Sequence, residues 1–329
     1  MGCLPQMKWT APAVAAMLCS AMVSAQEPPG AYPSRPVTLI SSTAAGGPID
    51  KEARIHAKMM GESLGQAFLV DYKSGAGGTI GVAYVAKAAP DGYTLLATNS
   101  SLTLFGALYK DLAFDSVRDF APLSLVSQRV TVLTARASFP VQTFAEFLAH
   151  LKANPGSINY GTSGAGSATH VASAWMNIAT NTRMTFVHYK GIAPVMLDML
   201  AGRLDVSPFT LALALPQLKA GKLRALAIMN NERTKLLPGV PTIAEQGIAD
   251  YSWVNWMGFL APGATPAVIV NKLSEGFIRI AKSPEVVAML EAEGNIPVGN
   301  TPAQFRQVIA IESARWRKVV QDVGIKLEE

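Results

Sequence analysis

The stretch Val37-Thr-Leu-Ile-Ser-Ser-Thr-Ala-Ala-Gly-Gly-Pro-Ile-Asp50 joins a short apolar run to a segment with helical periodicity. The run Val37–Ile40 is typical of a buried strand, and we expect a helix over residues 51–64. Between them, two glycines permit a tight turn, and Pro48 suits the first turn of a helix. The loop amides and the positive end of the helix dipole then favour an anion site. A simple tight turn is the alternative interpretation.

The alternation of strand-like and helix-like segments continues after this junction. Strand-like runs cover residues 67–70 and 93–97, and a helical pattern covers residues 80–88 between them. This order predicts parallel strands joined by helices, with ligand sites at the carboxyl ends of the strands. Asn99 and Ser100 directly follow the third strand, so we expect them to line such a site.

A second α/β unit is predicted from about residue 120 onward. Its expected strands cover residues 130–134, 158–160, 184–188, 203–206 and 223–228, and its expected helices cover 143–153, 169–179 and 193–200. A strand over 256–261 and helices over 266–281, 284–293 and 302–322 complete the chain. The predicted fold class is α/β with two lobes, each a mostly parallel sheet flanked by helices. Residues 32–126 and 250–329 form lobe I, residues 127–249 form lobe II, and a ligand cleft is expected between them.

A second glycine-rich loop, Gly161-Thr-Ser-Gly-Ala-Gly-Ser-Ala-Thr-His170, follows the expected strand over 158–160. Thr162 and Ser163 supply hydroxyl groups, Gly164 supplies an exposed amide, and a helix is expected to begin near the end of the loop. The loop is therefore the counterpart of the first loop on the other lobe. Amides from both lobes are expected to hold one anion together.

Three charged residues near these loops each have two interpretations. Asp50 lies in the first turn of the expected helix, where it either complements the helix dipole or touches a ligand. Lys190 follows the strand over 184–188 and either steers an anion or is simply solvated. Asp205 lies in the expected strand over 203–206 and accepts hydrogen bonds either from a ligand or from loop amides.

A hydrolase is the main catalytic alternative, because the segment from Gly161 to Ala165 nearly matches the motif G-x-S-x-G. Ser163 would be the nucleophile, with His170 or His188 as the base. The motif ends in alanine instead of glycine, and His170 follows Ser163 by only a few residues, unlike the usual order of such triads. We therefore predict no catalytic residue, no metal site and no cofactor.

Composition limits the class of protein. The chain has 329 residues, 50% of them hydrophobic, and a net charge of +5 without long basic runs. These values predict a globular protein that neither binds nucleic acid nor inserts into a membrane. Residues 1–25 are typical of a secretory signal peptide, starting at Met1 or Met7. Both cysteines lie within it, so the mature chain is expected to lack thiols; a lipid anchor at Cys19 is the alternative.

Several segments stand in the order and at the spacing of a known family. They are Tyr32-Pro-Ser-Arg-Pro36, Ala45-Gly-Gly-Pro-Ile-Asp50, Gly75-Ala-Gly-Gly78, Pro90-Asp-Gly-Tyr-Thr-Leu95, Asp119-Phe-Ala-Pro122, Tyr189-Lys-Gly191, Gly221-Lys-Leu-Arg-Ala-Leu-Ala227 and Leu237-Pro-Gly-Val-Pro-Thr242. With these segments the chain resembles the Bug family, the extracytoplasmic solute receptors of tripartite tricarboxylate transporters. The resemblance covers essentially the whole mature chain.

The resemblance implies a two-lobed periplasmic binding protein fold, similar to type II, that closes over a small carboxylate. It assigns ligand contacts to Ala45, Gly46 and Gly47 in the first loop, to Thr162, Ser163, Gly164 and His170 in the second, and to Asp205 opposite them. It also implies a periplasmic monomer that is not an enzyme and that delivers its ligand to membrane permease subunits. A sensor that presents its ligand to a signalling partner would use the same site. Which carboxylate binds stays open.

Overall fold

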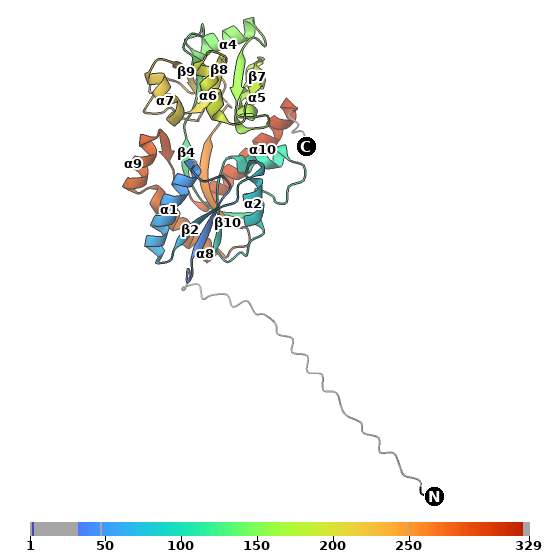
Figure 1. Ribbon diagram of the computed structural model, residues 1–329, viewed down its shortest axis with the longest axis vertical. Helices are drawn as coiled ribbons and strands as arrows, with labels where there is room; N and C mark the ends of the chain where they lie inside the picture. Colours follow the sequence, from blue (N-terminus) through green and yellow to red (C-terminus); the bar gives the residue numbers. More distant parts are fainter. Residues whose placement is uncertain (1, 3–31, 47, 250, 325–329) are drawn as a thin grey trace.

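The computed structural model describes residues 2, 32–46, 48–249 and 251–324, and these form two sheets surrounded by helices (Figure 1). The predicted signal peptide lies outside the described residues except for Gly2. The first sheet has the order β11 (Asn295–Pro297), β4 (Phe120–Arg129), β10 (Asn255–Pro262), β3 (Thr94–Asn99), β1 (Val37–Ser41) and β2 (Phe68–Tyr72). The second has the order β7 (Thr185–His188), β6 (Asn159–Thr162), β8 (Val206–Thr210), β5 (Thr131–Arg136) and β9 (Leu223–Ile228).

Both sheets are mixed. In lobe I, β1 pairs in parallel with β2 and β3, whereas β10 runs antiparallel to β3 and β4. In lobe II, β6 pairs in parallel with β7 and β8, whereas β5 runs antiparallel to β8 and β9. The prediction of two α/β lobes is confirmed, but the sheets are not mostly parallel. The antiparallel pairs arise because the chain leaves lobe I through β4 and returns through β10.

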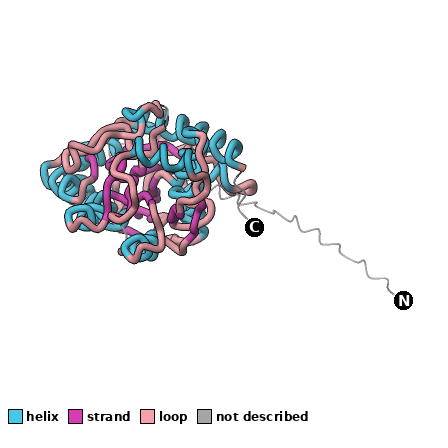
Figure 2. The backbone as a smooth tube through the Cα atoms, turned by 90° about the horizontal axis from the view of Figure 1, so that it is seen from above, coloured by secondary structure: helices cyan, strands magenta, loops and turns pink. Residues whose placement is uncertain are grey.

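Helices cover both faces of the lobe I sheet. On one face, α1 (Pro48–Leu64), α8 (Ala267–Ala281) and α9 (Pro284–Ala292) bury apolar side chains against β1, β3 and β10. On the other face, α2 (Thr79–Ala86), α3 (Ser101–Leu108) and the long α10 (Pro302–Val323) form a second apolar layer with the sheet. Figure 2 shows strands in the interior with helices around them. Such sandwiching explains the nearly continuous apolar runs of β1 and β3.

Lobe II is built in the same way. Helices α4 (Phe144–Ala153) and α5 (Ala168–Thr180) pack on one face of the sheet, and α6 (Ile192–Leu200) and α7 (Leu211–Lys219) pack on the other. Two short 3-10 helices, η1 (Ala76–Gly78) and η2 (Ala244–Gln246), complete the described elements. Ser167 caps α5, because its hydroxyl accepts a hydrogen bond from the amide of His170.

The lobes are joined at two crossings and by α10. The first crossing is Val130, between β4 and β5, and the second lies between β9 and β10. Asn230 links the crossings: its Nδ2 donates to the carbonyl of Arg129 (2.9 Å) and its Oδ1 accepts from the amide of Thr131 (2.7 Å). Helix α10 reaches the upper lobe in Figure 1, where Trp316 joins the lobe II core.

Strand register places the carboxyl ends of the parallel strands at facing edges of the two sheets. In lobe I, Asn99 at the end of β3 pairs with Met257, and Arg129 at the end of β4 pairs with Asn255. The crossing starts from this edge. In lobe II, Thr131 pairs with Thr210 at the end of β8, and β6 runs parallel to β8. The ends of β6 and β8 therefore point back toward lobe I.

The sequence patterns did not predict several elements of the structure. Strand β4 was not expected, because Pro122 and buried serines interrupt its apolar run; the Ser124 hydroxyl is satisfied by the carbonyl of Asn300 (2.9 Å). The short elements α3, α7 and β11 were also missed. The strand expected over residues 203–206 is wrong: β8 begins at Val206 and continues through Pro208 to Thr210.

Candidate functional site

The first loop, residues 43–46, leaves the carboxyl end of β1 and leads into α1. The hydroxyls of Ser41 and Ser42 are used within the protein: Ser41 donates to the carbonyl of Thr43 (2.9 Å), and Ser42 shares a hydrogen bond with Thr98 (3.0 Å). Gly46 has φ of 83°, a left-handed conformation that favours glycine. Ala45 and Gly46 are exposed, and the predicted ligand residue Gly47 lies outside the described residues.

Asp50 holds the first loop in place. Its Oδ2 accepts the amide of Gly46 (2.8 Å), and its Oδ1 accepts Arg54 Nε (2.7 Å) and the hydroxyl of Tyr72. Burial opposes ionisation of the carboxyl, but the bonds from Tyr72, Gly46 and Arg54 outweigh it and lower the pKa of Asp50. Both carboxylate oxygens are thus engaged by the protein, so the geometry gives Asp50 the role of a loop support.

Some loop amides remain available. Within the described ranges, the amides of Ala44 and Ala45 have no hydrogen-bond acceptor. They precede the N-terminus of α1, whose dipole adds positive potential in the same direction. The first loop therefore presents donors suited to an anion.

The two predicted residues after β3 behave differently. Ser100 is buried, and its hydroxyl donates to Oδ1 of Asn255 (3.3 Å). Asn99 is half-buried, and its Oδ1 accepts the amide of Ser101 (3.0 Å). Asn99 lies at the same edge of the sheet as the first loop, whereas the Ser100 side chain faces the protein.

The second loop leads from β6 into α5. The amide of Ser163 donates to Thr169 Oγ1 (2.9 Å), and the amide of Gly166 donates to His170 Nδ1 (3.0 Å). Gly164 has φ of 144°, which favours glycine at this position. In the part of the chain that the structure describes, the amides of Gly164 and Ala165 lack acceptors. This loop matches the first: each combines free amides with a helix N-terminus.

A pair of histidines lies beside the second loop. The rings of His170 and His188 are 4.6 Å apart, and His188 Nδ1 is 2.7 Å from the hydroxyl of Thr162. Burial, and secondarily the nearby His188, lower the pKa of His170 to about 4, and burial also lowers the pKa of His188. The sequence suggested His188 only as a hydrolase base. Its position as the last residue of β7 was the signal for a site residue.

The hydrolase geometry is not present. The hydroxyl of Ser163 pairs with Thr169 Oγ1 (2.9 Å), and His170 Nδ1 is occupied by the amide of Gly166. His188 faces Thr162 instead of Ser163. A serine nucleophile needs a base within hydrogen-bond reach, and neither imidazole is bonded to this hydroxyl.

Lys190 and Asp205 lie in different surroundings. Lys190 is exposed and follows β7 at the edge that carries the second loop. Asp205 precedes β8, so it lies at the amino ends of β6 and β8, about 16 Å along the strand from the facing edge. There it accepts Arg136 Nε (3.1 Å) and the amide of Asn159 (2.9 Å). This position does not fit the expected role opposite the loops, because the strand begins later than the sequence suggested.

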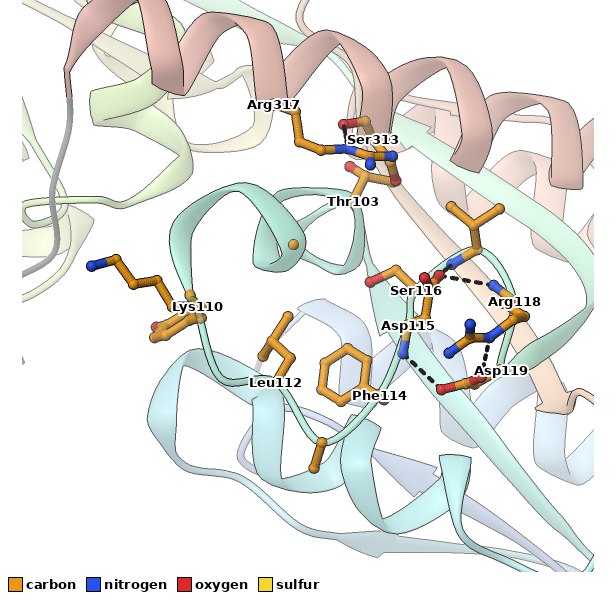
Figure 3. A pocket seen from close by; sticks show the side chains of 14 residues that line it. Thr103, Lys110, Leu112, Phe114, Asp115, Ser116, Arg118, Asp119, Ser313 and Arg317 are labelled. Carbon is orange, nitrogen blue, oxygen red and sulfur yellow. Dashed lines mark hydrogen bonds and ion pairs between the residues drawn. The ribbon is translucent and has the colours of Figure 1, made fainter.

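Two surface cavities lie away from the loops. One, of about 510 Å³, lies between α10 and the segment after α3, lined by Ser116, Ser313 and Arg317 among others (Figure 3). The other, of about 580 Å³, lies between α5 and α10 beside Trp175 and Arg315. None of the predicted ligand residues lines either cavity.

No group of three or more His, Cys, Asp or Glu side chains in the described ranges could hold a metal ion. No helix in these ranges is both long and apolar enough to cross a membrane.

Two α/β lobes, two crossings and facing loop–helix junctions define the class of two-lobed solute-binding proteins. The chain belongs to the tripartite tricarboxylate transporter receptor family, because the profile described as "Tripartite tricarboxylate transporter family receptor" matches residues 52–325. The resemblance in the sequence is thereby confirmed. Members and structural neighbours of this family are solute receptors, not enzymes.

Relatives match over nearly their full length. The chain is 37% identical to the UPF0065 protein in the TAR-I ttuE-ttuC' intergenic region of Agrobacterium vitis, over 89% of this chain and 86% of that one. It is 33% identical to Protein BugT of Bordetella pertussis, over 94% of this chain and 96% of that protein.

Solved structures share the fold. R. palustris Rpa4515 with adipate is 32% identical, with a TM-score of 0.76, over 90% of this chain and 99% of that one. MatC from Rhodopseudomonas palustris with bound malate is 31% identical, with a TM-score of 0.73, over 88% of this chain and 100% of that one.

Proposed function

We propose that this chain is a periplasmic receptor that binds a small carboxylate between its lobes and delivers it to a membrane permease. The proposed contacts are Ala45, Gly46 and Gly47 in the first loop and Thr162, Ser163, Gly164 and His170 in the second, with the free amides of Ala45 and Gly164 among the donors. Asn99 completes the lobe I side, and Lys190 adds positive potential on the lobe II side.

One observation carries this proposal: both loop–helix junctions lie at facing sheet edges, with free amides in each loop. An anion bound at either helix N-terminus alone would be held weakly and remain hydrated. An anion that meets both sets of donors gains contacts only when the lobes approach. Binding therefore favours a closed arrangement to the extent that the ligand prefers it.

The structures that contain adipate and malate support the ligand class. Both ligands are small dicarboxylates, and both proteins share about a third of their residues with this chain. The predicted signal peptide over residues 1–25 supports export. We propose that the mature protein acts as a monomer, in which closure presents a new surface to the permease.

The first experiment is a thermal-shift screen of the mature protein against mono-, di- and tricarboxylates, amino acids and aromatic acids. A ligand at about 100 times its dissociation constant adds about 2.7 kcal/mol of stability, which raises the melting temperature measurably. Small-angle scattering then checks for compaction with the best ligand. If no acid in the screen raises the melting temperature, the proposed ligand class is wrong.

Charge insertion locates the site. Ala45→Asp and Ala165→Asp each place a carboxylate on an exposed loop position, so each should weaken binding by about tenfold or more. Ala310→Asp, on the exposed face of α10, is the matched control and should leave affinity unchanged. Equal affinities for all three variants would place the ligand elsewhere.

A further inference from the structure

Two of the four histidines of the chain meet at the candidate site. His56 is buried in lobe I, and His150 lies on α4 with its ring against Phe139. His170, in the first turn of α5, instead meets His188, the last residue of β7, near the carboxyl ends of β6 and β7. The ring of Phe186, which packs against the lobe II core, lies beside both, with centroids 5.0 Å from His170 and 6.4 Å from His188.

The hydrogen bond from Gly166 fixes the state of His170. Because an amide donates to Nδ1 (3.0 Å), Nδ1 must be the unprotonated nitrogen, and the neutral ring carries its hydrogen on Nε2. Protonation of Nδ1 would break this bond and place a second hydrogen against the amide. The N-terminus of α5 also disfavours a cation at this position. His170 therefore remains a neutral donor.

The hydrogen-bond partner of His188 can pair with either the neutral or the protonated imidazole. Its Nδ1 faces the hydroxyl of Thr162 (2.7 Å), and a hydroxyl can donate to a bare nitrogen or accept from a protonated one. His188 is also the more exposed ring of the pair. It can thus gain a proton without losing its hydrogen bond, which His170 cannot do.

No carboxylate in the described part of the chain pairs with either imidazole. The groups that face the pair are Thr162 from β6 and Phe186 from β7, and Lys190 follows His188 by two residues. Burial lowers the pKa of both imidazoles below the usual 6.5, and the neighbouring His188 lowers that of His170 further, so both are mostly neutral near pH 7 in the empty protein. A negative charge at this position must therefore come from the ligand.

We propose that His188 takes up one proton from solvent when a carboxylate ligand binds, and that the resulting imidazolium selects ligands with a second acidic group. This inference rests on the proposed function. The first carboxylate is held by the amides of the two loops. In the imidazolium, Nδ1–H donates to the hydroxyl of Thr162, and Nε2–H is left for the second carboxylate.

The expected consequence is a dependence of affinity on pH with a defined sign. Binding raises the pKa of His188, so affinity increases as the pH falls from the bound-state value toward the free-state value. The increase is at most about tenfold for each pH unit for one proton. A monocarboxylate leaves the imidazole without an anionic partner, so its affinity should change much less.

Isothermal titration calorimetry at pH 6.5, in buffers with different ionisation enthalpies, counts the protons taken up. The probes are malate and adipate, with acetate as the monocarboxylate. We expect uptake of about half to one proton for wild type, none for His188→Gln, and retained uptake at weaker affinity for His170→Gln. His150→Gln is the matched control and should behave as wild type.

A second measurement covers the case in which His188→Gln no longer binds. The NMR signal of the His188 ring, assigned by its loss in this variant, should titrate at higher pH in wild type saturated with malate or adipate than in free wild type. If dicarboxylates bind without proton uptake and without raising the pH at which His188 titrates, the inference is overturned and the receptor function stands. Failure of every acid in the thermal-shift screen to bind overturns both.

Discussion

Glu52 of α1 and Arg129 at the end of β4 form a buried ion pair, with Arg129 Nη2 2.7 Å from Glu52 Oε1. The hydroxyl of Ser127 donates to the other carboxylate oxygen, and the carbonyl of Arg129 is held by Asn230 (2.9 Å). The pair therefore connects the helix that follows the first loop with the first crossing between the lobes. Burial raises the pKa of Glu52, and the Arg129 charge opposes that rise.

Removing either partner should strongly destabilise the protein. Glu52→Met or Arg129→Met leaves one uncompensated buried charge, at a cost of about 3–5 kcal/mol. The double variant buries no charge and should be much closer to wild type. Chemical denaturation of all four proteins gives the coupling energy. The neighbouring exposed pair Lys51–Glu293 is the control, and Lys51→Met should cost less than about 1 kcal/mol. Additive effects of Glu52→Met and Arg129→Met would contradict the ion pair.

Gly161→Ala should destabilise lobe II. A Cβ at Gly161 would lie 2.5 Å from Val195 Cγ1 and 2.7 Å from Leu204 Cδ1, so these buried side chains or the backbone of β6 must shift. Overpacking of this kind costs about 1–3 kcal/mol, measurable as a lower denaturation midpoint. Gly106→Ala is the matched control, because no atom lies within 4 Å of its Cβ and it is in α3. That change should be neutral or stabilising by up to about 1 kcal/mol.

His56 should make the protein sensitive to acid. Its Nδ1 donates to the carbonyl of Glu52 (2.8 Å), its Nε2 has no partner, and burial lowers its pKa to about 4. The unfolded chain takes up this proton near pH 6.5, so the free energy of unfolding falls as the pH drops from 6.5 to 4. At about 1.4 kcal/mol per pKa unit, the loss is about 3 kcal/mol.

The test is a comparison with His56→Leu. The stability of wild type minus that of the variant, measured by urea denaturation from pH 8 to pH 4, should decrease by about this amount as the pH falls. Any fixed packing effect of leucine shifts the difference equally at all pH values. A difference that stays constant across the range would show that His56 takes up its proton at the same pH in the folded protein as in the unfolded chain, and would contradict the lowered pKa.

Glu312 should have the opposite effect on the pH dependence of stability, lowering the free energy of unfolding as the pH rises. It accepts Trp256 Nε1 (2.8 Å), and burial raises its pKa to about 7, above the unfolded value of 4.5. Its stabilising effect is complete below pH 4.5 and is lost as the pH rises through 7. Glu312→Gln should therefore be more stable than wild type by about 3 kcal/mol at pH 8, and similar at pH 4.5. Thermal unfolding at both pH values is the measurement, and the exposed Glu275→Gln should show no such crossover.

The local parts of the site could be read from the sequence. Glycines, a proline and apolar runs act on their immediate neighbours, so the first loop and the start of α1 were predictable. The same holds for the second loop before α5. Asp205 was misplaced because the strand expected over residues 203–206 ends where β8 begins, which shifted the residue from one end of the strand to the other.

Contacts between residues far apart in the chain could not be predicted from the sequence patterns. The patterns gave no sign that His188 would meet His170, since strand β7 and helix α5 come together only when the sheet forms. Strand β4 was missed for a similar reason, because its buried serines are satisfied by distant groups such as the carbonyl of Asn300. Both cases depend on residues far apart in the chain.

The sequence by itself determined the two α/β lobes, the two glycine-rich loops and the family, because these depend on backbone preferences and on spacing along the chain. Only the tertiary structure decided that both loops occupy facing sheet edges, that Asp50 supports a loop, and that the chain crosses between lobes at Val130. Strand order, register and side-chain contacts are set by packing between distant segments. The packing energies depend on those segments together, so no one segment determines them.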